Sequence, residues 1–177
     1  YVEITSNGSD DSGNAKGLFI DITGNTANSL TLADDLSTYT FKGDETIAIY
    51  KHHTIGSVFG ANNSSGLQGG TSAGDADVIK IWNPLTQRFS SYFYNSAVNE
   101  WKSATNPFGP NTSSEVFYAD QGFVIYRKGT GTVEMKVTGS VKVGPSKAQI
   151  YSGYNFYDNK KPIDMTLGET GWENDIL

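Results

Sequence analysis

The chain has 177 residues, a formal net charge of −6 at pH 7 and no cysteine. Because 37% of its residues are apolar and 12% are aromatic, the chain can bury a packed core, which excludes global disorder. The negative charge and the lack of a Lys/Arg cluster argue against nucleic acid as a partner, and the absence of cysteine excludes a disulfide framework, a cysteine metal site and a thiol nucleophile.

The composition favours β-structure. Charged residues make up only 18% of the chain, whereas helical proteins need Ala, Leu, Glu, Lys and Arg for their exposed faces. The 20 glycines lie among short runs of Val, Ile, Thr, Tyr and Phe, as expected for strands joined by many turns. The sequence therefore predicts an all-β, antiparallel fold, sandwich-like or barrel-like, with one domain or two packed β units. No apolar run approaches the roughly 18 residues that span a bilayer, so we expect no membrane span.

Residues 1–59 are predicted to form the first β unit. Apolar residues recur there with a period of two in short runs separated by polar turns, which is typical of half-buried strands. The chain starts inside such a run without Met or a signal-like segment, so we expect it to be a piece of a longer protein. The predicted strands lie at residues 1–5, 18–23, 29–32 and 46–50.

The pattern changes after His53. Thr54 is placed to cap a single helical turn that runs to Phe59. Residues 60–76 have little to bury except Leu67, which predicts a long surface loop or linker. This segment is the best candidate for a seam between the two β units.

Residues 77–177 are predicted to form the second β unit, and its clearest feature is a hairpin at residues 77–101. Asn83 and Pro84 start the turn, because Pro fixes φ and the Asn side chain bonds the local backbone. The flanking runs are β-branched and aromatic, as in hairpin strands. Further strands are predicted at residues 115–118, 122–128, 132–138 and 140–143, before an irregular end at 153–177.

Several short motifs are distributed over most of the chain: residues 1–6, Asn25-Thr26 with 30–32, residues 43–47, 54–60, 77–101 and 121–127, and Asn155, Pro162, Thr166 and Leu167. Together they resemble an uncharacterised family of exported, β-rich proteins from Verrucomicrobia and related bacteria. The resemblance implies export and a β-rich fold, and it implies that this chain lacks the family's N-terminal portion. The family carries no known activity or site, so no catalytic residue follows from it.

Four aromatic residues of the second unit suggest a ligand site: Trp82, Tyr92, Tyr94 and Trp101. Flat aromatic rings stack on sugars, and Tyr92 and Tyr94 share one strand face. The alternative interpretation is that neighbouring elements cover both faces and that the rings belong to the core. A carbohydrate-binding module is therefore our alternative function, with polysaccharide as its partner.

Acidic loops suggest a second site. Asp10 and Asp11, and Asp75 and Asp77, place hard oxygen ligands on short, glycine-containing loops. Ca²⁺ prefers such oxygens, although neither loop has EF-hand or nonapeptide-repeat spacing and acidic turns are commonly just solvated. Calcium is the only cofactor that the sequence suggests.

No pattern in the sequence points to catalysis. His52 and His53 are adjacent at a strand end, so their side chains point to opposite faces and do not chelate one metal. No serine lies in a Gly-x-Ser-x-Gly elbow, and no spacing distinguishes a carboxylate pair of the glycosidase type. The carboxylates considered are Glu3, Asp21, Glu115 and Glu134. We expect a protein that is not an enzyme.

These observations predict a non-catalytic, extracellular structural module at the cell surface. The acidic, cysteine-free composition, rich in Asn, Ser, Thr and Gly, resembles that of exported proteins. We expect the module to be part of a surface layer, fibre or appendage, and to associate with itself or with other surface proteins. Open strand edges at Tyr1 and near the C-terminus are the expected points of strand addition.

Overall fold

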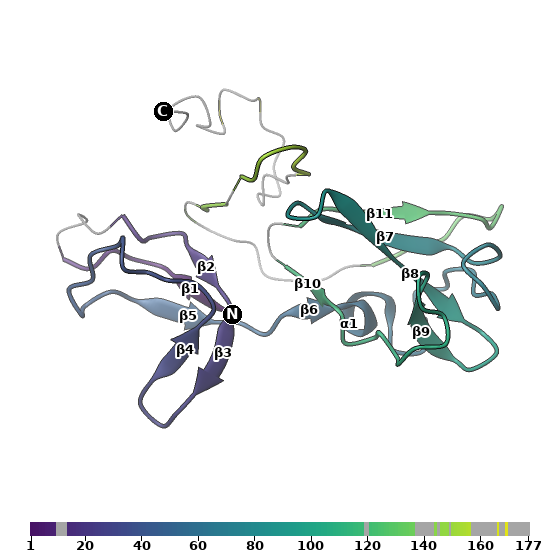
Figure 1. Cartoon of the computed structure of the whole chain (residues 1–177), viewed down its shortest axis with the longest axis horizontal. Coiled ribbons are helices and arrows are strands. Elements are labelled where there is room, and N and C mark those ends of the chain that lie inside the picture. Colours follow the sequence, from purple (N-terminus) through teal and green to yellow (C-terminus); the bar gives the residue numbers. More distant parts are fainter. Residues whose placement is uncertain are drawn as a thin grey trace.

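A computed structural model describes residues 1–9, 14–118, 121–136, 144, 146–148, 150–156, 166 and 169. This part of the chain forms four antiparallel sheets and one short helix, which confirms the predicted all-β fold. No sheet in this part closes into a barrel. The strands gather in two lobes, which lie at the left and right of Figure 1. The helix in the described part of the chain is too short to cross a membrane.

The first lobe combines a three-stranded sheet with a separate hairpin. In the sheet, β1 lies between β2 and β5, and Val2 and Ile4 point together into the core, as their alternation predicts. The edge at Tyr1 that the sequence predicts to be open is therefore covered, because β1 is the central strand. The strands are β1 (Val2–Ile4), β2 (Phe19–Ile20), β5 (Ile47–Ile49), β3 (Ile22–Asn25) and β4 (Leu30–Leu32).

The second lobe is a four-stranded sheet in the order β11-β7-β8-β9. β7 and β8 form a hairpin where the sequence predicts one, and the Asn83 side chain closes its turn by accepting bonds from the backbone of Leu85 and Thr86 at 3.0 Å each. Gln87 and Asn99 take a positive φ in the two turns that flank β8. The strands are β7 (Val78–Asn83), β8 (Arg88–Asn95), β9 (Glu100–Ser103) and β11 (Phe123–Tyr126).

A short sheet and the helix complete the second lobe. β6 (His53–Thr54) pairs with β10 (Val116–Phe117), and α1 (Ile55–Phe59) follows β6 directly. The core of this lobe consists of Ile55, Phe59, Leu67, Ile79, Ile81, Tyr92, Tyr94, Trp101 and Phe117.

The helix and loop 60–76 pack with the second lobe. Ile55 and Phe59, which the sequence assigns to the first unit, are fully buried in its core, and Leu67 of the loop joins them. Their apolar side chains meet the rings of the β8–β9 hairpin, with the centroids of Phe59 and Trp101 6.0 Å apart. In Figure 1 the chain passes between the lobes on the segment from β5 to β6. The division into two folding units stays a prediction.

One predicted strand does not pair. Residues 132–136 lie in no sheet, and the remainder of the predicted strands at 132–138 and 140–143 lies outside the described residues. Val133 and Met135 are nevertheless half-buried while Glu134 and Lys136 are exposed, and Met135 packs against the second core. The period of two therefore places the side chains correctly although no neighbouring strand is bonded to this segment.

Thr54 caps α1 with the reciprocal bonds of a capping box. Its side chain accepts from the Ser57 backbone at 3.2 Å, and the Ser57 hydroxyl accepts from the Thr54 backbone at 2.7 Å. We expect Thr54→Ala to lower the free energy of unfolding by about 1 kcal/mol, because a first-turn N–H loses its partner. Urea unfolding measures the change. Thr54→Ser keeps the hydroxyl and should unfold like the wild type, and an unchanged Thr54→Ala would contradict the role of the cap.

Candidate functional site

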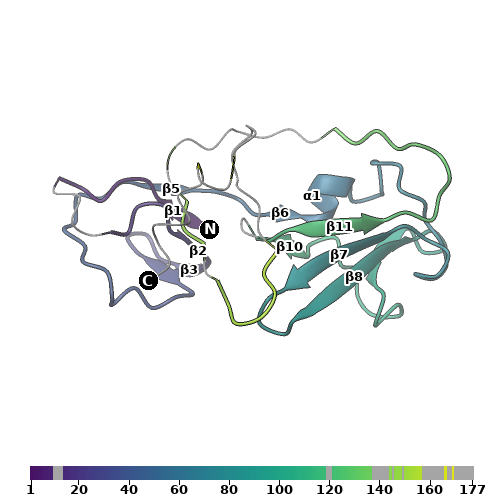
Figure 2. The ribbon, with the colours of Figure 1, turned by 90° about the horizontal axis from the view of Figure 1, so that it is seen from above.

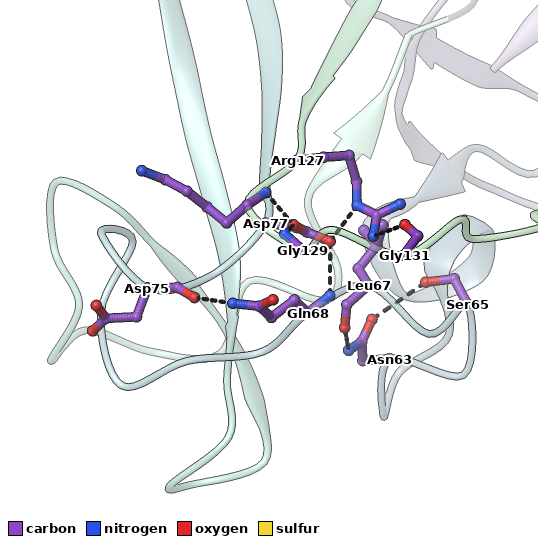
Figure 3. A network of polar contacts seen from close by, with 10 residues as sticks. Asn63, Ser65, Leu67, Gln68, Asp75, Asp77, Arg127, Gly129 and Gly131 are labelled. Carbon is purple, nitrogen blue, oxygen red and sulfur yellow. Dashed lines mark hydrogen bonds and ion pairs between the residues drawn. The ribbon is translucent and has the colours of Figure 1, made fainter.

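Asp77 is the most densely bonded side chain that the sequence predicts as a ligand. It precedes β7 and is buried, with 1% of its surface exposed. One carboxylate oxygen accepts from the backbone of Lys128 at 2.6 Å and of Gly129 at 3.2 Å. The other accepts from the backbone of Gln68 at 2.8 Å and lies 2.7 Å from Nε of Arg127. Figure 3 shows these groups converging on the carboxylate from loop 60–76 and from the end of β11.

This arrangement keeps Asp77 ionised. Burial raises the pKa of its carboxyl group, but the three backbone N–H groups and the Arg127 guanidinium outweigh burial and hold the pKa below its usual range. The carboxylate therefore holds loop 60–76 and the chain after β11 against the start of β7. Its oxygens are occupied by donors of the protein, which makes it a structural anchor.

The two acidic loops that the sequence predicts to bind calcium differ in what the structure shows of them. Asp77 is paired with Arg127, and Asp75 is exposed, with its carboxylate accepting from the Ser72 hydroxyl at 2.9 Å, so the two carboxylates have different partners. Calcium binding stays a prediction. Asp10 and Asp11 lie outside the described residues. Among the described residues, no group of three or more His, Cys, Asp or Glu side chains is arranged to hold a metal ion.

The structure does not bring the four predicted aromatic residues into one platform. Tyr92, Tyr94 and Trp101 lie in the second core, and Trp101 is 0% exposed, with its indole N–H donating to the carbonyl of Gly60 at 2.8 Å. Burial, together with the neighbouring Glu115 carboxylate, raises the pKa of Tyr92 to about 12. A sugar needs an exposed ring face, which these three residues do not offer.

Strand register explains why Trp82 lies on a different face of the sheet from the other three predicted aromatic residues. Trp82 pairs with Phe89, and Ile79 pairs with Tyr92, so the two pairs lie on opposite faces of the sheet. Tyr94 pairs with Trp101 on the Tyr92 face. The core side of the sheet therefore holds three of the predicted rings and its other side holds Trp82.

Trp82 and the β7–β8 turn hold a segment that the sequence predicts to be irregular. The indole N–H of Trp82 donates to the Tyr154 carbonyl at 2.9 Å, and the Gln87 side chain bonds both the N–H and the carbonyl of Tyr154, at 2.6 and 3.1 Å. Phe156 packs against Trp82, with centroids 5.1 Å apart. Residues 146–148 lie at the first lobe, where the Lys147 N–H donates to the Gly17 carbonyl, and residues 150–156 lead to this turn (Figure 2). No local pattern in the sequence signals this contact.

His52 links the lobes. Its Nε2 lies 3.0 Å from a carboxylate oxygen of Asp21, and its ring lies between those of Tyr1 and Tyr118, at centroid distances of 5.0 and 5.6 Å. His53 belongs to β6 and is exposed. The pair thus diverges, as adjacent positions in an extended chain predict.

The free edge of β5 is the clearest surface that combines an unpaired strand edge with exposed apolar side chains. β5 pairs with β1 on one side, and among the described residues no strand pairs with its other side. Ile47 and Ile49 are 52% and 62% exposed, although they lie opposite Ile4 and Val2 on the core side of the sheet. The apolar face of this sheet thus extends beyond the layer that covers it.

Among the described residues, the outward backbone groups of the same two isoleucines have no partner. Tyr1 and Tyr50 exchange bonds of 2.9 Å, and the Thr5 N–H donates to the Thr46 carbonyl at 2.8 Å. Because bonded and non-bonded positions alternate in an antiparallel ladder, the N–H and carbonyl groups of Ile47 and Ile49 point away from β1. One strip of the surface therefore offers both backbone groups and apolar side chains.

A second free edge lies in the other lobe. β11 pairs with β7 alone among the described strands, and Val124 and Tyr126 are 44% and 50% exposed. In contrast, the edge strand β9 is partly covered, because the Trp101 carbonyl accepts from the Thr112 N–H at 2.9 Å. β5 and β11 are thus two of the free sheet edges in the described part of the chain, and both expose large apolar residues.

Comparison with protein-family models, curated proteins and solved structures gives no match for this chain.

Proposed function

We propose that this chain is an exported, non-catalytic structural module that assembles into a surface layer, fibre or appendage by adding strands at its sheet edges. The observation that carries the proposal is the free edge of β5, where Ile47 and Ile49 expose their side chains beside open backbone groups. Proteins that remain monomeric usually protect such edges by keeping them very short or with charged residues, proline, bulges or covering loops. The strand Ile47–Ile49 carries neither charge nor proline.

Two edges support an extended assembly. β5 belongs to the first lobe and β11 to the second, on different parts of the molecule (Figure 1). A single self-complementary contact closes at a dimer, whereas a subunit with two separate contacts continues a chain or layer. The acidic, cysteine-free composition supports export, because a surface protein without cysteine avoids free thiols in an oxidising compartment.

The proposal predicts that the purified chain forms concentration-dependent assemblies through its apolar edge. Ile49→Lys places a charge at the most exposed apolar position of β5 and should weaken the association at least tenfold, because lysine on an edge strand opposes pairing. Sedimentation velocity across a range of concentrations measures the change.

The control is Val98→Lys, which adds the same charge at a residue of comparable exposure, 54%, in the β8–β9 turn. It should associate like the wild type. A wild-type chain that sediments as a monomer at every concentration would contradict the proposed function.

A further inference from the structure

We propose that the partner of β5 is β5 of a second copy, paired antiparallel about a two-fold axis at Ala48. This inference rests on the proposed function and specifies the partner and the register. In this register Ile47 of one copy lies opposite Ile49 of the other, and Ala48 lies opposite Ala48.

Hydrogen-bond alternation permits this pairing. Ile47 and Ile49 are the positions whose backbone groups point away from β1. With the axis at Ala48, Ile47 of each copy pairs with Ile49 of the other. The outward N–H and carbonyl groups of both residues then form hydrogen bonds in both copies. The existing ladder to β1 is unaffected, because it uses the other side of the strand.

The apolar side chains favour the same register. Ile47 and Ile49 lie on one face of β5 and are more than half exposed. The pairing brings the isoleucines of both copies together on the side that faces the core of each lobe. A sheet of three strands thereby becomes a sheet of six, with a continuous apolar face.

The flanking charges distinguish this register from its neighbours. With the axis at Ala48, Glu45 of one copy lies opposite Lys51 of the other, and the reverse pair forms as well. An axis at Ile47 would instead place Ile49 opposite Glu45, and an axis at Ile49 would place Ile47 opposite Lys51. A parallel pairing in register would oppose Lys51 with Lys51. Opposite charges across a strand pair stabilise it and like charges oppose it.

Ala48→Cys tests the register directly, because the chain has no other cysteine. Ala48 lies on the axis at a non-bonded position, where Cα atoms in antiparallel strands are about 4.5 Å apart, a separation that a disulfide can bridge. We expect mild oxidation to convert the variant into a covalent dimer at least tenfold more completely than Val98→Cys, an exposed cysteine in the β8–β9 turn. Non-reducing electrophoresis measures the yield, and reduction should reverse it.

Charge exchange provides a second measurement that does not depend on a cysteine. Lys51→Glu should weaken the association at least fivefold, and the double variant Glu45→Lys/Lys51→Glu should recover it. The carboxylate of Glu45 also accepts bonds from the backbone of Lys42 and Gly43, so circular dichroism must show that the double variant keeps the wild-type fold.

The outcomes separate this inference from the proposed function. If Ala48→Cys gives no more dimer than Val98→Cys while Ile49→Lys still abolishes association, the edge is used in another arrangement and the two-fold pairing is overturned. If the double charge variant stays as weak as Lys51→Glu, the register is overturned. If the wild type never associates, both the inference and the proposed function fail.

Discussion

Asp77→Asn is expected to lower the free energy of unfolding by about 3 kcal/mol, the magnitude associated with breaking a buried ion pair. The amide has the shape of the carboxylate but turns an N–H group toward the Gln68 backbone N–H, which donates to Asp77, and toward the positively charged Arg127 guanidinium. A buried donor then meets a donor, and each unsatisfied group costs about 1–3 kcal/mol. Urea unfolding at pH 7 measures the loss.

The matched control is Asp75→Asn, two residues earlier on the same loop. Asp75 is exposed and bonds the Ser72 hydroxyl, so its replacement should change stability by less than about 0.5 kcal/mol. Equal effects of the two variants would contradict the anchoring role of Asp77.

The same residue contributes to acid sensitivity. The folded state lowers the pKa of Asp77, so its contribution is fully present above the unfolded value of about 3.9 and is lost as the pH falls through the lower folded pKa. The stability difference between the wild type and Asp77→Asn should therefore be constant near neutral pH and shrink in strongly acidic solution. A difference that grows on acidification would contradict this linkage.

Trp101→Ala is expected to lower the free energy of unfolding by about 3–5 kcal/mol, because a fully buried ring is removed from a packed core. The ring packs between Phe59 and Tyr94, at centroid distances of 6.0 and 5.4 Å, and its N–H holds the Gly60 carbonyl. The substitution leaves a cavity and removes one of two hydrogen bonds to the Gly60 carbonyl, which keeps its bond from the Asn63 N–H at 3.0 Å. Circular dichroism with urea measures the loss.

Trp101→Phe keeps an aromatic ring and should lose less stability than the alanine variant. Val98→Ala, at an exposed position of the preceding turn, should change stability by less than about 0.5 kcal/mol. If Trp101→Ala kept the wild-type stability but lost binding to a polysaccharide, the aromatic residues would form a sugar site and their assignment to the core would be wrong.

The proposed assembly would also account for the contrast between the edges of this molecule. The β9 edge is partly covered by the loop at Thr112, whereas β5 and β11 keep apolar residues at their free sides. Pairing of β5 with β5 of a second copy would form backbone hydrogen bonds and would also bury the apolar side chains beside them. This combination gives strand addition its affinity.

The sequence by itself determined the local structure of this protein. A period of two in the apolar residues placed most of the described strands, Asn83 and Pro84 placed the turn of the β7–β8 hairpin, and Thr54 placed the start of α1. These features depend on residues within a few positions of one another, so that side-chain alternation, a fixed φ and a capping bond are sufficient to specify them.

Only the tertiary structure decided which side chains are buried and which are exposed. It buried Trp101 and Tyr94, and it bonded Asp77 to the backbone of Lys128 and Gly129, which lie 51 and 52 positions further along the chain. It also joined Trp82 to Tyr154 across 72 positions. It also left Ile47 and Ile49 exposed, although their alternation is the same as that of a buried strand. Alternation states which side chains share a face, whereas the order of strands and the layer above each face determine whether that face meets protein or water.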